Sequence, residues 1–290
     1  MKGVSVGDAF GESFFGDHDS VIEHISRRTV PESKWEFSDD TIMALSVFEE
    51  LEDNRTINQD SLIKRFVQKH DLDVNRGYGA TTRRMLREVG EGGDWRVISN
   101  AVFDGMGSMG NGAAMRVGTI GAYFHDDLEL VAAMAKRSAE VTHANIEAIA
   151  GAVAIAKAVA IATQSSVLVP EEFIEKVVFE LPESDVKSRI KKSTTVSYTY
   201  HIDTVISILG NGTKIQAQDT VPFCVWCAAH NLGSFEEALW KAVSALGDRD
   251  TICAMVAGIT IMSSDEDQIP RQWFDQAEDF ESSIFRHLTT

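Results

Sequence analysis

Apolar residues recur at helical spacing in several long segments of this chain, and this periodicity limits the fold more than any other feature. It is clearest over residues 44–51, 62–67, 128–135 and 238–243, where apolar side chains fall three and four positions apart. The segment 146–163 alternates Ala with larger apolar residues, but its length and alanine content favour a buried helix over a strand. Strand and hairpin patterns are scarce. The sequence therefore predicts an all-α protein.

Length and composition fit one packed unit. The chain has 290 residues, of which 44% are hydrophobic, and this is enough to bury a substantial core. Glycine and proline fall between the helical segments, where they mark short connections. No segment has the composition of a flexible interdomain linker. We therefore expect a compact single domain over residues 1–290.

The charge balance argues against two classes of partner. The formal net charge is −17, whereas proteins that bind nucleic acid concentrate Lys and Arg against the phosphate backbone. No run of about 18 uncharged apolar residues predicts a membrane span. The closest segment, 146–163, contains Glu147 and Lys157. The sequence thus predicts a protein that binds neither nucleic acid nor a membrane.

Cysteine usage favours a reducing compartment. The chain has three cysteines and no long apolar segment at its N-terminus, so we expect a cytoplasmic protein. Cys224 and Cys227 form a C-x-x-C pair, which occurs in redox sites and in half of some zinc sites. No second pair lies nearby, and the surrounding sequence is apolar and helical. Two buried thiols are therefore the expected interpretation.

A hydroxyl, two adjacent carboxylates and a second hydroxyl stand directly before the apolar run IMALSVFEEL. They are Ser38, Asp39, Asp40 and Thr41, in the stretch FSDDT. Such residues commonly cap a helix, because their oxygens accept hydrogen bonds from the free N–H groups of its first turn. The same oxygens are the ligands that Mg²⁺ and Mn²⁺ prefer. This motif alone does not separate a cap from a metal site.

A second acidic helix start lies near the other end of the chain. In LGDRDT, Asp248, Asp250 and Thr251 again precede an apolar helical run. If the fold brings the two starts together, their carboxylates repel one another, which raises their pKa values or demands a cation. The sequence therefore predicts either two independent caps or one metal centre.

A glycine-rich turn lies between the two acidic starts. The stretch GSMGNG, residues 107–112, leads into an apolar segment that we expect to begin a helix. Glycine lets backbone N–H groups approach a ligand closely, and a helix start favours an anion such as a pyrophosphate. The same glycines also permit an ordinary tight connection. Further on, His143 precedes another helical segment, where it is either a ligand contact or a satisfied structural histidine.

Five stretches together resemble the ADP-ribosylglycohydrolase family, which includes the dinitrogenase-reductase-activating glycohydrolases and the eukaryotic ADP-ribosylhydrolases. They are GVSVGDAFGESF (3–14), FSDDTIMAL (37–45), GNGAAMRVGTIG (110–121), THANIEAIAGA (142–152) and LGDRDTICAMVAG (246–258). Their order along the chain is that of the family. The segment 164–200 and the C-terminal tail contribute least to the resemblance.

The resemblance implies an all-α orthogonal helical bundle whose acidic helix starts converge on Mg²⁺, with two ions expected and Mn²⁺ as an alternative. Ser38 stands where the family usually has threonine, which keeps the hydroxyl oxygen. The implied metal ligands are Ser38, Asp39, Asp40, Asp248, Asp250 and Thr251. The implied catalytic residues are Asp39, Asp40 and Asp250, with Thr41 and Asp8 as supporting residues. The implied substrate-binding residues are Ser108, Met109, Gly110, Asn111, Gly112 and His143.

Two positions depart from the family's pattern. Phe15 stands where many members have a glutamate that assists the metal site or the attacking water. Glu12, Glu32 and Glu36 are the candidate substitutes, and the general base stays unassigned. Ala80 stands where the nitrogenase-type enzymes carry an aspartate, so an arginine-linked substrate is not assured.

The implied reaction is metal-dependent hydrolysis of the bond that joins ADP-ribose to a protein side chain, arginine first, or to a small acceptor. Cleavage at an anomeric carbon builds oxocarbenium-like charge, which carboxylates and an oriented water stabilise. The implied partners are ADP-ribose and ADP-ribosylated proteins. One alternative is an immunity or ADP-ribose-binding protein that counters an ADP-ribosylating toxin with little or no turnover. Another is a different binuclear-metal hydrolase, acting on a phosphoester or an ADP-ribosylated metabolite.

Overall fold

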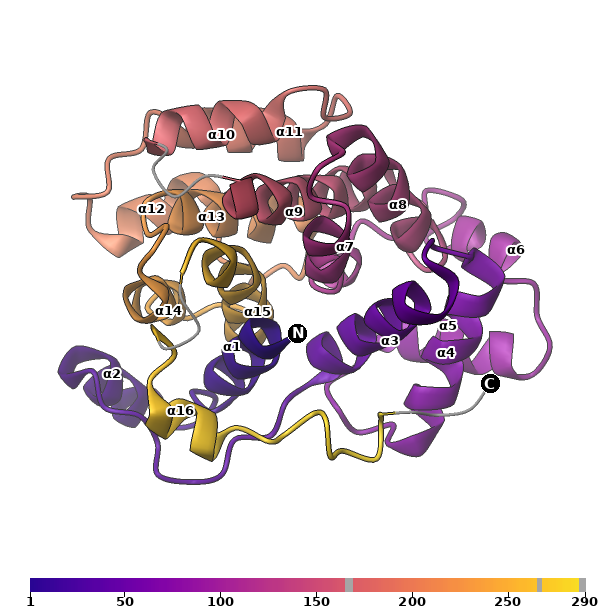
Figure 1. The fold of residues 1–290 in the computed structure, drawn as a ribbon, viewed down its shortest axis with the longest axis horizontal. Helices are drawn as coiled ribbons and strands as arrows, with labels where there is room; N and C mark the ends of the chain where they lie inside the picture. The colour runs from indigo at the N-terminus through magenta and orange to yellow at the C-terminus, as the bar shows by residue number, and fades with distance from the viewer. Residues whose placement is uncertain (165–168, 265–267, 287–290) are drawn as a thin grey trace.

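The computed structural model of the chain is built from helices, which confirms the predicted all-α fold (Figure 1). It describes residues 1–164, 169–264 and 268–286. In that part of the chain, extended pairing is limited to isolated bridges between Trp35 and Ala277 and between Gly110 and Gln216. The helices are α1 (Lys2–Glu12), α2 (His18–Arg27), α3 (Asp39–Asn54), α4 (Gln59–Leu72), α5 (Ala80–Gly90), α6 (Trp95–Ala101), η1 (Asn111–Ala113), α7 (Gly118–Tyr123), α8 (Leu128–Glu140), α9 (Ile146–Gln164), α10 (Pro170–Val178), α11 (Asp185–Ser193), α12 (Ile202–Leu209), α13 (Ala217–Ala229), α14 (Phe235–Val243), α15 (Arg249–Thr260), η2 (Ile261–Ser263) and α16 (Arg271–Gln276).

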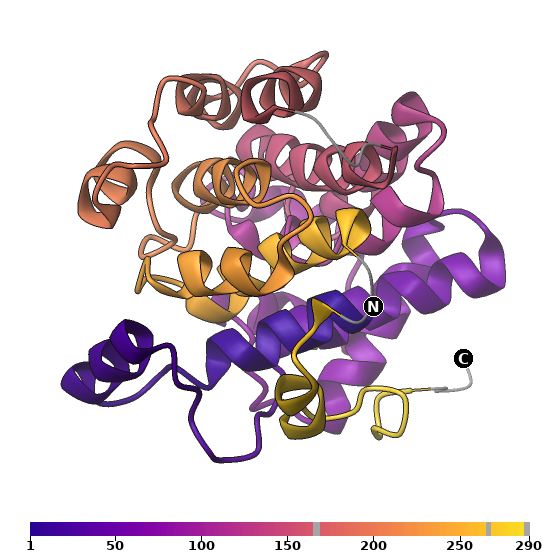
Figure 2. The same ribbon diagram turned by 60° about the vertical axis from the view of Figure 1, so that its left-hand side comes forward.

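Helix α1 packs directly on α15, although the two lie at opposite ends of the sequence (Figures 1 and 2). Gly3, Gly7 and Gly11 recur every four residues and so form one face of α1. A Cβ atom on Gly7 would lie 2.5 Å from the carbonyl oxygen of Cys253, and one on Gly11 would lie 2.6 Å from the carbonyl carbon of Arg249. The two backbones can therefore touch only because these positions carry no side chain.

Helix α9 is the predicted buried helix, which the structure confirms. It contacts α7, α8, α13 and α15, and its residues from Ala148 to Ala162 are buried. By length and composition alone it could cross a membrane, but 83% of its most apolar window is buried inside the protein. Its apolar character is thus accounted for by its place in the core.

The three cysteines are buried and unpaired, as predicted for Cys224 and Cys227. Both lie on α13, and Cys253 lies on α15. Burial raises the pKa of the Cys227 thiol to about 12, so this sulfur stays protonated and unreactive at neutral pH.

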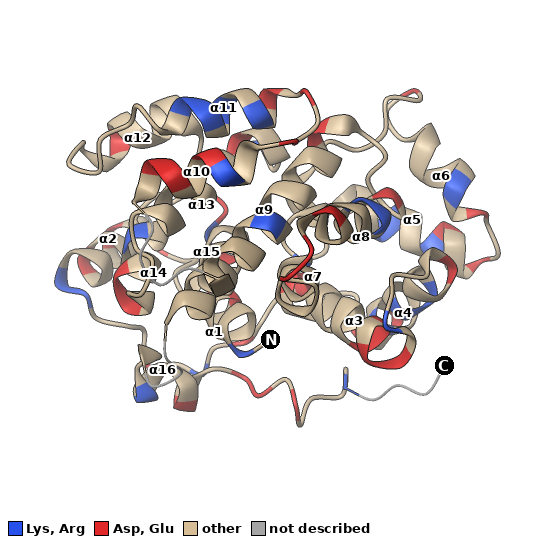
Figure 3. Ribbon diagram, turned by 45° about the horizontal axis from the view of Figure 1, so that its top comes forward, with Lys and Arg blue, Asp and Glu red and all other residues tan. Residues whose placement is uncertain are grey.

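One contiguous hydrophobic cluster extends from Val6 to Phe285 and joins most helices. This continuity supports the proposed single domain over residues 1–290. The C-terminal segment after α16 returns to the N-terminal half, where Glu278 pairs with Arg76 and the carbonyl oxygen of Phe285 accepts from Lys69 Nζ. The locally basic segment 185–200 forms α11 and the loop after it, and Figure 3 shows its Lys and Arg residues beside acidic α10.

The contact between α1 and α15 predicts a strong effect for the smallest possible side chain. We expect Gly7→Ala to lower the free energy of unfolding by about 2 kcal/mol, because the methyl group must push the two backbones apart and this outweighs the better helix propensity of Ala. Gly16→Ala is the control, since nothing lies within 4 Å of a Cβ atom at that position. Urea unfolding of both variants measures the difference, and an unchanged Gly7→Ala would contradict the close contact.

Candidate active site

The structure brings the two acidic helix starts together. Thr251 Oγ1, in the first turn of α15, donates a hydrogen bond to Asp40 Oδ2, in the first turn of α3, at 3.2 Å. Ser38 Oγ donates to the same oxygen at 3.2 Å. Segments from opposite ends of the chain therefore share one buried carboxylate.

Asp8 holds the start of α3 through hydrogen bonds. Its Oδ2 atom accepts hydrogen bonds from the backbone N–H groups of Ser38 and Thr41, both at 2.9 Å, and from Thr41 Oγ1 at 2.6 Å. Because Asp8 lies on α1, which packs on α15, these hydrogen bonds hold the start of α3 close to α15. Asp8 and Thr41 are thus bonded to each other at the start of α3, and the supporting role that the resemblance implies for them stays a prediction.

A side-chain cap is present at the start of α3 and absent at the start of α15. Ser38 Oγ accepts from the backbone N–H of Asp40 at 3.1 Å, so it is both an N-cap and a member of the cluster. Asp248 is the N-cap residue of α15 but makes no side-chain cap bond. Its Oδ2 atom instead accepts from Asn111 Nδ2 at 2.6 Å, across the site.

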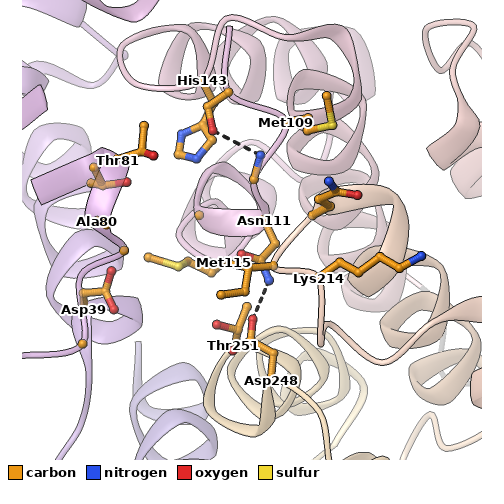
Figure 4. A pocket seen from close by; sticks show the side chains of 18 of the residues that line it. Asp39, Ala80, Thr81, Met109, Asn111, Met115, His143, Lys214, Asp248 and Thr251 are labelled. Atoms are coloured by element: carbon orange, nitrogen blue, oxygen red, sulfur yellow. Dashed lines mark hydrogen bonds between the residues drawn. The ribbon is translucent and has the colours of Figure 1, made fainter. Parts of the chain in front are cut away.

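A pocket of about 480 Å³ opens over this cluster, within the usual size of small-molecule sites. Figure 4 shows Asp39 on one side, Thr251 and Asp248 on another, and His143 beyond the turn that carries Asn111. The predicted residues that line the pocket are Asp39, Asp40, Ser108, Met109, Gly110, Asn111, Gly112, His143, Asp248, Asp250 and Thr251. The other three predicted residues, Ser38, Thr41 and Asp8, are buried and are not among the described lining residues. Ser38 bonds to Asp40 of the lining, and Thr41 bonds to Asp8.

The prediction that a helix begins directly after the glycine turn is wrong. Residues Asn111–Ala113 form a short 3₁₀ turn, η1, and α7 begins only at Gly118. The N–H groups of Ala114 and Met115 both bond to the carbonyl oxygen of Asn111, which closes the turn before a longer helix can continue. The turn therefore offers the pocket an Asn side chain and side-chain-free glycines, and it does not offer a helix N-terminus.

Apart from Ala80, the sequence did not indicate three further parts of the lining. These are residues 77–82, which include the first turn of α5, and the loops around residues 103–106 and 214–216. Each is flanked by a glycine with positive φ, namely Gly77, Gly105 and Gly212. These glycines were the available signal, but turn glycines do not by themselves indicate which loops face one site.

Of the two departures from the family's pattern, Ala80 lines the pocket and Phe15 is not among its described lining residues. Phe15 is 47% exposed, and the guanidinium of Arg249 lies 4.7 Å from its ring centre. Burial and the charges of Asp250 and Glu36 raise the pKa of Glu12. Among the described residues that line the pocket, none of the candidate substitutes for the missing glutamate occurs.

Burial raises the pKa of every carboxyl group in the cluster, and the charges of neighbouring aspartates raise it further for all of them except Asp250. Burial and then the charge of Asp250 raise the pKa of Asp8 to about 7 and that of Asp248 to about 7. The same causes, in the same order, raise the pKa of Asp39 well above its usual value. Burial and then the charges of Asp8 and Asp250 do so for Asp40, and burial raises that of Asp250. Without a cation, the cluster is therefore partly protonated near neutral pH.

The donor set fits a hard cation in its chemistry. The Oδ1 atoms of Asp8, Asp40 and Asp250 are buried and have no hydrogen-bond partner in the described part of the protein. Buried carboxylate oxygens without partners are costly unless a positive charge compensates them. In their present rotamers, however, no three Asp, Glu, His or Cys side chains of residues 1–164, 169–264 and 268–286 are arranged to hold a metal ion. Ligation therefore requires the carboxylates to turn.

Comparison with known proteins identifies the family. The sequence profile described as ADP-ribosylglycohydrolase matches residues 1–289. The chain belongs to the ADP-ribosylglycohydrolase family. The predicted resemblance is thus confirmed over nearly the whole chain, and the family is one of glycohydrolase enzymes.

Individual relatives agree with this assignment. ADP-ribosylhydrolase ARH3 of Xenopus tropicalis is 29% identical over 322 residues, covering 98% of this chain and 91% of the relative. The human protein of the same name is 28% identical over 331 residues, covering 98% and 89%. A solved structure described as an ADP-ribosylglycohydrolase-related protein complex has the same fold, with a TM-score of 0.69, 20% identity and coverage of 96% and 90%.

The raised pKa values predict how the metal-free protein responds to pH. A carboxyl group whose pKa is higher in the folded protein favours folding while it is protonated. For Asp8 and Asp248 this contribution is complete below the ordinary value of 3.8 and is lost as the pH rises through about 7. We expect the free energy of unfolding in EDTA to fall by at least about 2 kcal/mol between about pH 5 and about pH 8.

Chemical denaturation in EDTA at several pH values measures this decline. Asp248→Asn removes one titrating group and its repulsion, so its profile should be flatter than that of the wild type. If the free energy of unfolding of the wild type rises over the same interval, the raised pKa values of Asp8 and Asp248 are contradicted.

Proposed function

We propose that this protein hydrolyses the bond between ADP-ribose and a side chain of a modified protein, or a small ADP-ribosylated acceptor, with a divalent cation. The observation that carries the proposal is that the two acidic helix starts and the Gly110–Gly112 turn line one and the same pocket. Membership of the family and the relatives named as ADP-ribosylhydrolases support it.

The residues proposed to hold the cation offer oxygen alone, which favours Mg²⁺, with Mn²⁺ as a substitute, over softer metals. We propose two ions, in keeping with the family resemblance. The proposed ligands are Ser38, Asp39, Asp40, Asp248, Asp250 and Thr251. When bound, such a cation supplies positive charge for the sugar hydroxyls and lowers the pKa of a bound water.

The chain's own residues would orient the sugar and accept the proton. Asn111 Nδ2 donates hydrogen bonds to Asp248 Oδ2 at 2.6 Å and to Thr220 Oγ1 at 3.1 Å, and these fix its side chain in the pocket wall. Since Glu12 does not line the pocket, proton acceptance from the attacking water falls to an aspartate of the cluster. Asp39, Asp40 and Asp250 are the proposed catalytic residues.

The lining near Asp39 bears on the acceptor. Gly79, Ala80, Thr81 and Thr82 form this part of the pocket, and none of them offers a carboxylate that could pair with a guanidinium. This composition gives less support to the expected arginine linkage than to an uncharged acceptor such as a serine hydroxyl. The arginine linkage therefore stays a prediction that the assay must test.

The proposal predicts metal-dependent release of free ADP-ribose. An arginine-ADP-ribosylated protein and a serine-ADP-ribosylated protein should be assayed side by side, first with Mg²⁺ and then with EDTA. We expect Asp40→Asn and Asp250→Asn to lower the rate by at least about 100-fold, because each removes a carboxylate from the cluster. Asp203→Asn is the control, since Asp203 is an exposed first-turn aspartate of α12.

Each other outcome of this assay has a definite meaning. Full activity in Asp40→Asn or Asp250→Asn would remove that residue from the site. ADP-ribose binding without release from either substrate would favour the binding or immunity protein, and release of inorganic phosphate would favour a different metal-dependent hydrolase. Activity that survives EDTA would contradict the proposed cation.

The glycine turn predicts a separate effect on binding. A Cβ atom on Gly112 would lie 3.2 Å from His143 Cε1, so Gly112→Val should push the imidazole and the turn apart. We expect ADP-ribose affinity to fall by about tenfold or more, since a misplaced turn loses its contacts with the ligand. Calorimetry measures the affinity, with Gly16→Val as the control at an open position. Wild-type affinity in Gly112→Val would place the ligand elsewhere.

A further inference from the structure

Arg116 is a completely buried cation close to the pocket. Its Nη2 atom donates to the carbonyl oxygen of Ser138 at 2.5 Å and to Thr142 Oγ1 at 2.8 Å, and its guanidinium lies 4.5 Å from the ring centre of Phe66. Burial lowers its pKa to about 9, against the charge of Asp39, so it stays protonated at neutral pH. A buried charge is costly, and here its hydrogen bonds are directed to neutral oxygens and to the sulfur of Met43.

The hydrogen bond from Arg116 fixes the direction of the next one. Thr142 Oγ1 lies 2.7 Å from His143 Nδ1. A guanidinium can only donate, so Thr142 Oγ1 accepts from it and can direct its own proton to His143 Nδ1. The opposite direction, with Nδ1 as the donor, would leave the buried hydroxyl proton of Thr142 without an acceptor, which is unfavourable. Nδ1 is therefore unprotonated, and the ring proton is on Nε2.

The protonated nitrogen faces the glycine turn. A Cβ atom on Gly110 would lie 3.1 Å from His143 Nε2, and one on Gly112 would lie 3.3 Å from it. His143 lines the pocket at this point, beyond the turn that carries Asn111 (Figure 4). Burial and then the charge of Arg116 lower the pKa of His143 to about 3, so the ring is neutral at pH 7.

We propose that Arg116 and Thr142 are positioning residues that hold His143 in its Nε2–H tautomer, so that Nε2 donates a hydrogen bond to an oxygen of the ligand at the Gly110–Gly112 turn. The ligand oxygen belongs to a phosphate or to a ribose hydroxyl, since both accept hydrogen bonds. This inference rests on the proposed function for the identity of the ligand and on the contacts above for the tautomer. Arg116 itself is fully buried and acts only through Thr142.

The tautomer can be measured without any ligand. Nitrogen-15 chemical shifts of the imidazole at about pH 7 distinguish a protonated Nε2 from a protonated Nδ1, and His143→Gln assigns the signals. We expect the wild type and Thr142→Ser to show a protonated Nε2 and an unprotonated Nδ1, and Thr142→Val to lose this preference. Thr119→Val is the matched control, because the buried hydroxyl of Thr119 has no hydrogen-bond partner in the described residues.

Affinity for ADP-ribose tests the consequence. We expect Thr142→Val to weaken binding by about tenfold, whereas Thr142→Ser and Thr119→Val bind as the wild type does. A wild-type His143 with a protonated Nδ1, or Thr142→Val with an unchanged tautomer, would overturn the positioning role. Unchanged affinity in Thr142→Val despite an altered tautomer would overturn the donated hydrogen bond.

The two proposals fail separately. If the wild type does not bind ADP-ribose at all, the proposed function fails and the donation to that ligand fails with it. The nitrogen-15 measurement still decides the positioning role in that case, because it uses the free protein.

Discussion

The contact between α1 and α15 is the constraint on which the site depends. Gly7 and Gly11 let the two backbones touch, so a helix from the first residues of the chain lies against one from residues 249–260. Asp8 projects from α1 onto the start of α3, and Gly11 lies beside the start of α15. The two acidic helix starts are therefore neighbours because one helix carries glycine at every fourth position, and the carboxylate cluster follows from that packing.

The sequence was informative about the elements and less so about their contacts. Helical spacing predicted the all-α fold, and the buried helix α9 followed from its alanine content. The motifs indicated the residues that line the pocket, because those residues stand at helix starts and turns with recognisable chemistry. The glycines of α1 were visible in the same stretch, but their role was not, since it depends on backbone atoms of residues near the opposite end of the chain.

The misses have a common physical origin. A helix was expected after Gly112, whereas the carbonyl oxygen of Asn111 closes a single turn and Arg116 is buried before α7 begins. Arg116 itself gave no signal, because a lone arginine in an apolar stretch is usually exposed. The lining also includes Thr81, from the first turn of α5, and Ile215, from a loop, and the positions of both segments depend on packing with distant parts of the chain. Local propensity does not contain this information.

The charge of the pocket links the proposed cation to the proposed ligand. The lining carries several aspartates and, among its described residues, Lys214 as its cationic side chain, in a protein of net charge −17. An anionic diphosphate would be repelled by such a surface unless positive charge were added to it. A divalent cation held by the aspartates would reduce the repulsion among these aspartates. It would also reduce the repulsion between the pocket and the diphosphate. Asn111 joins the two halves, since its Nδ2 atom bonds to Asp248 while its backbone forms the turn beside His143. Under the proposed function, movement of Asp248 toward a cation would change a hydrogen bond of the turn, and this one side chain would couple cation binding to ligand binding.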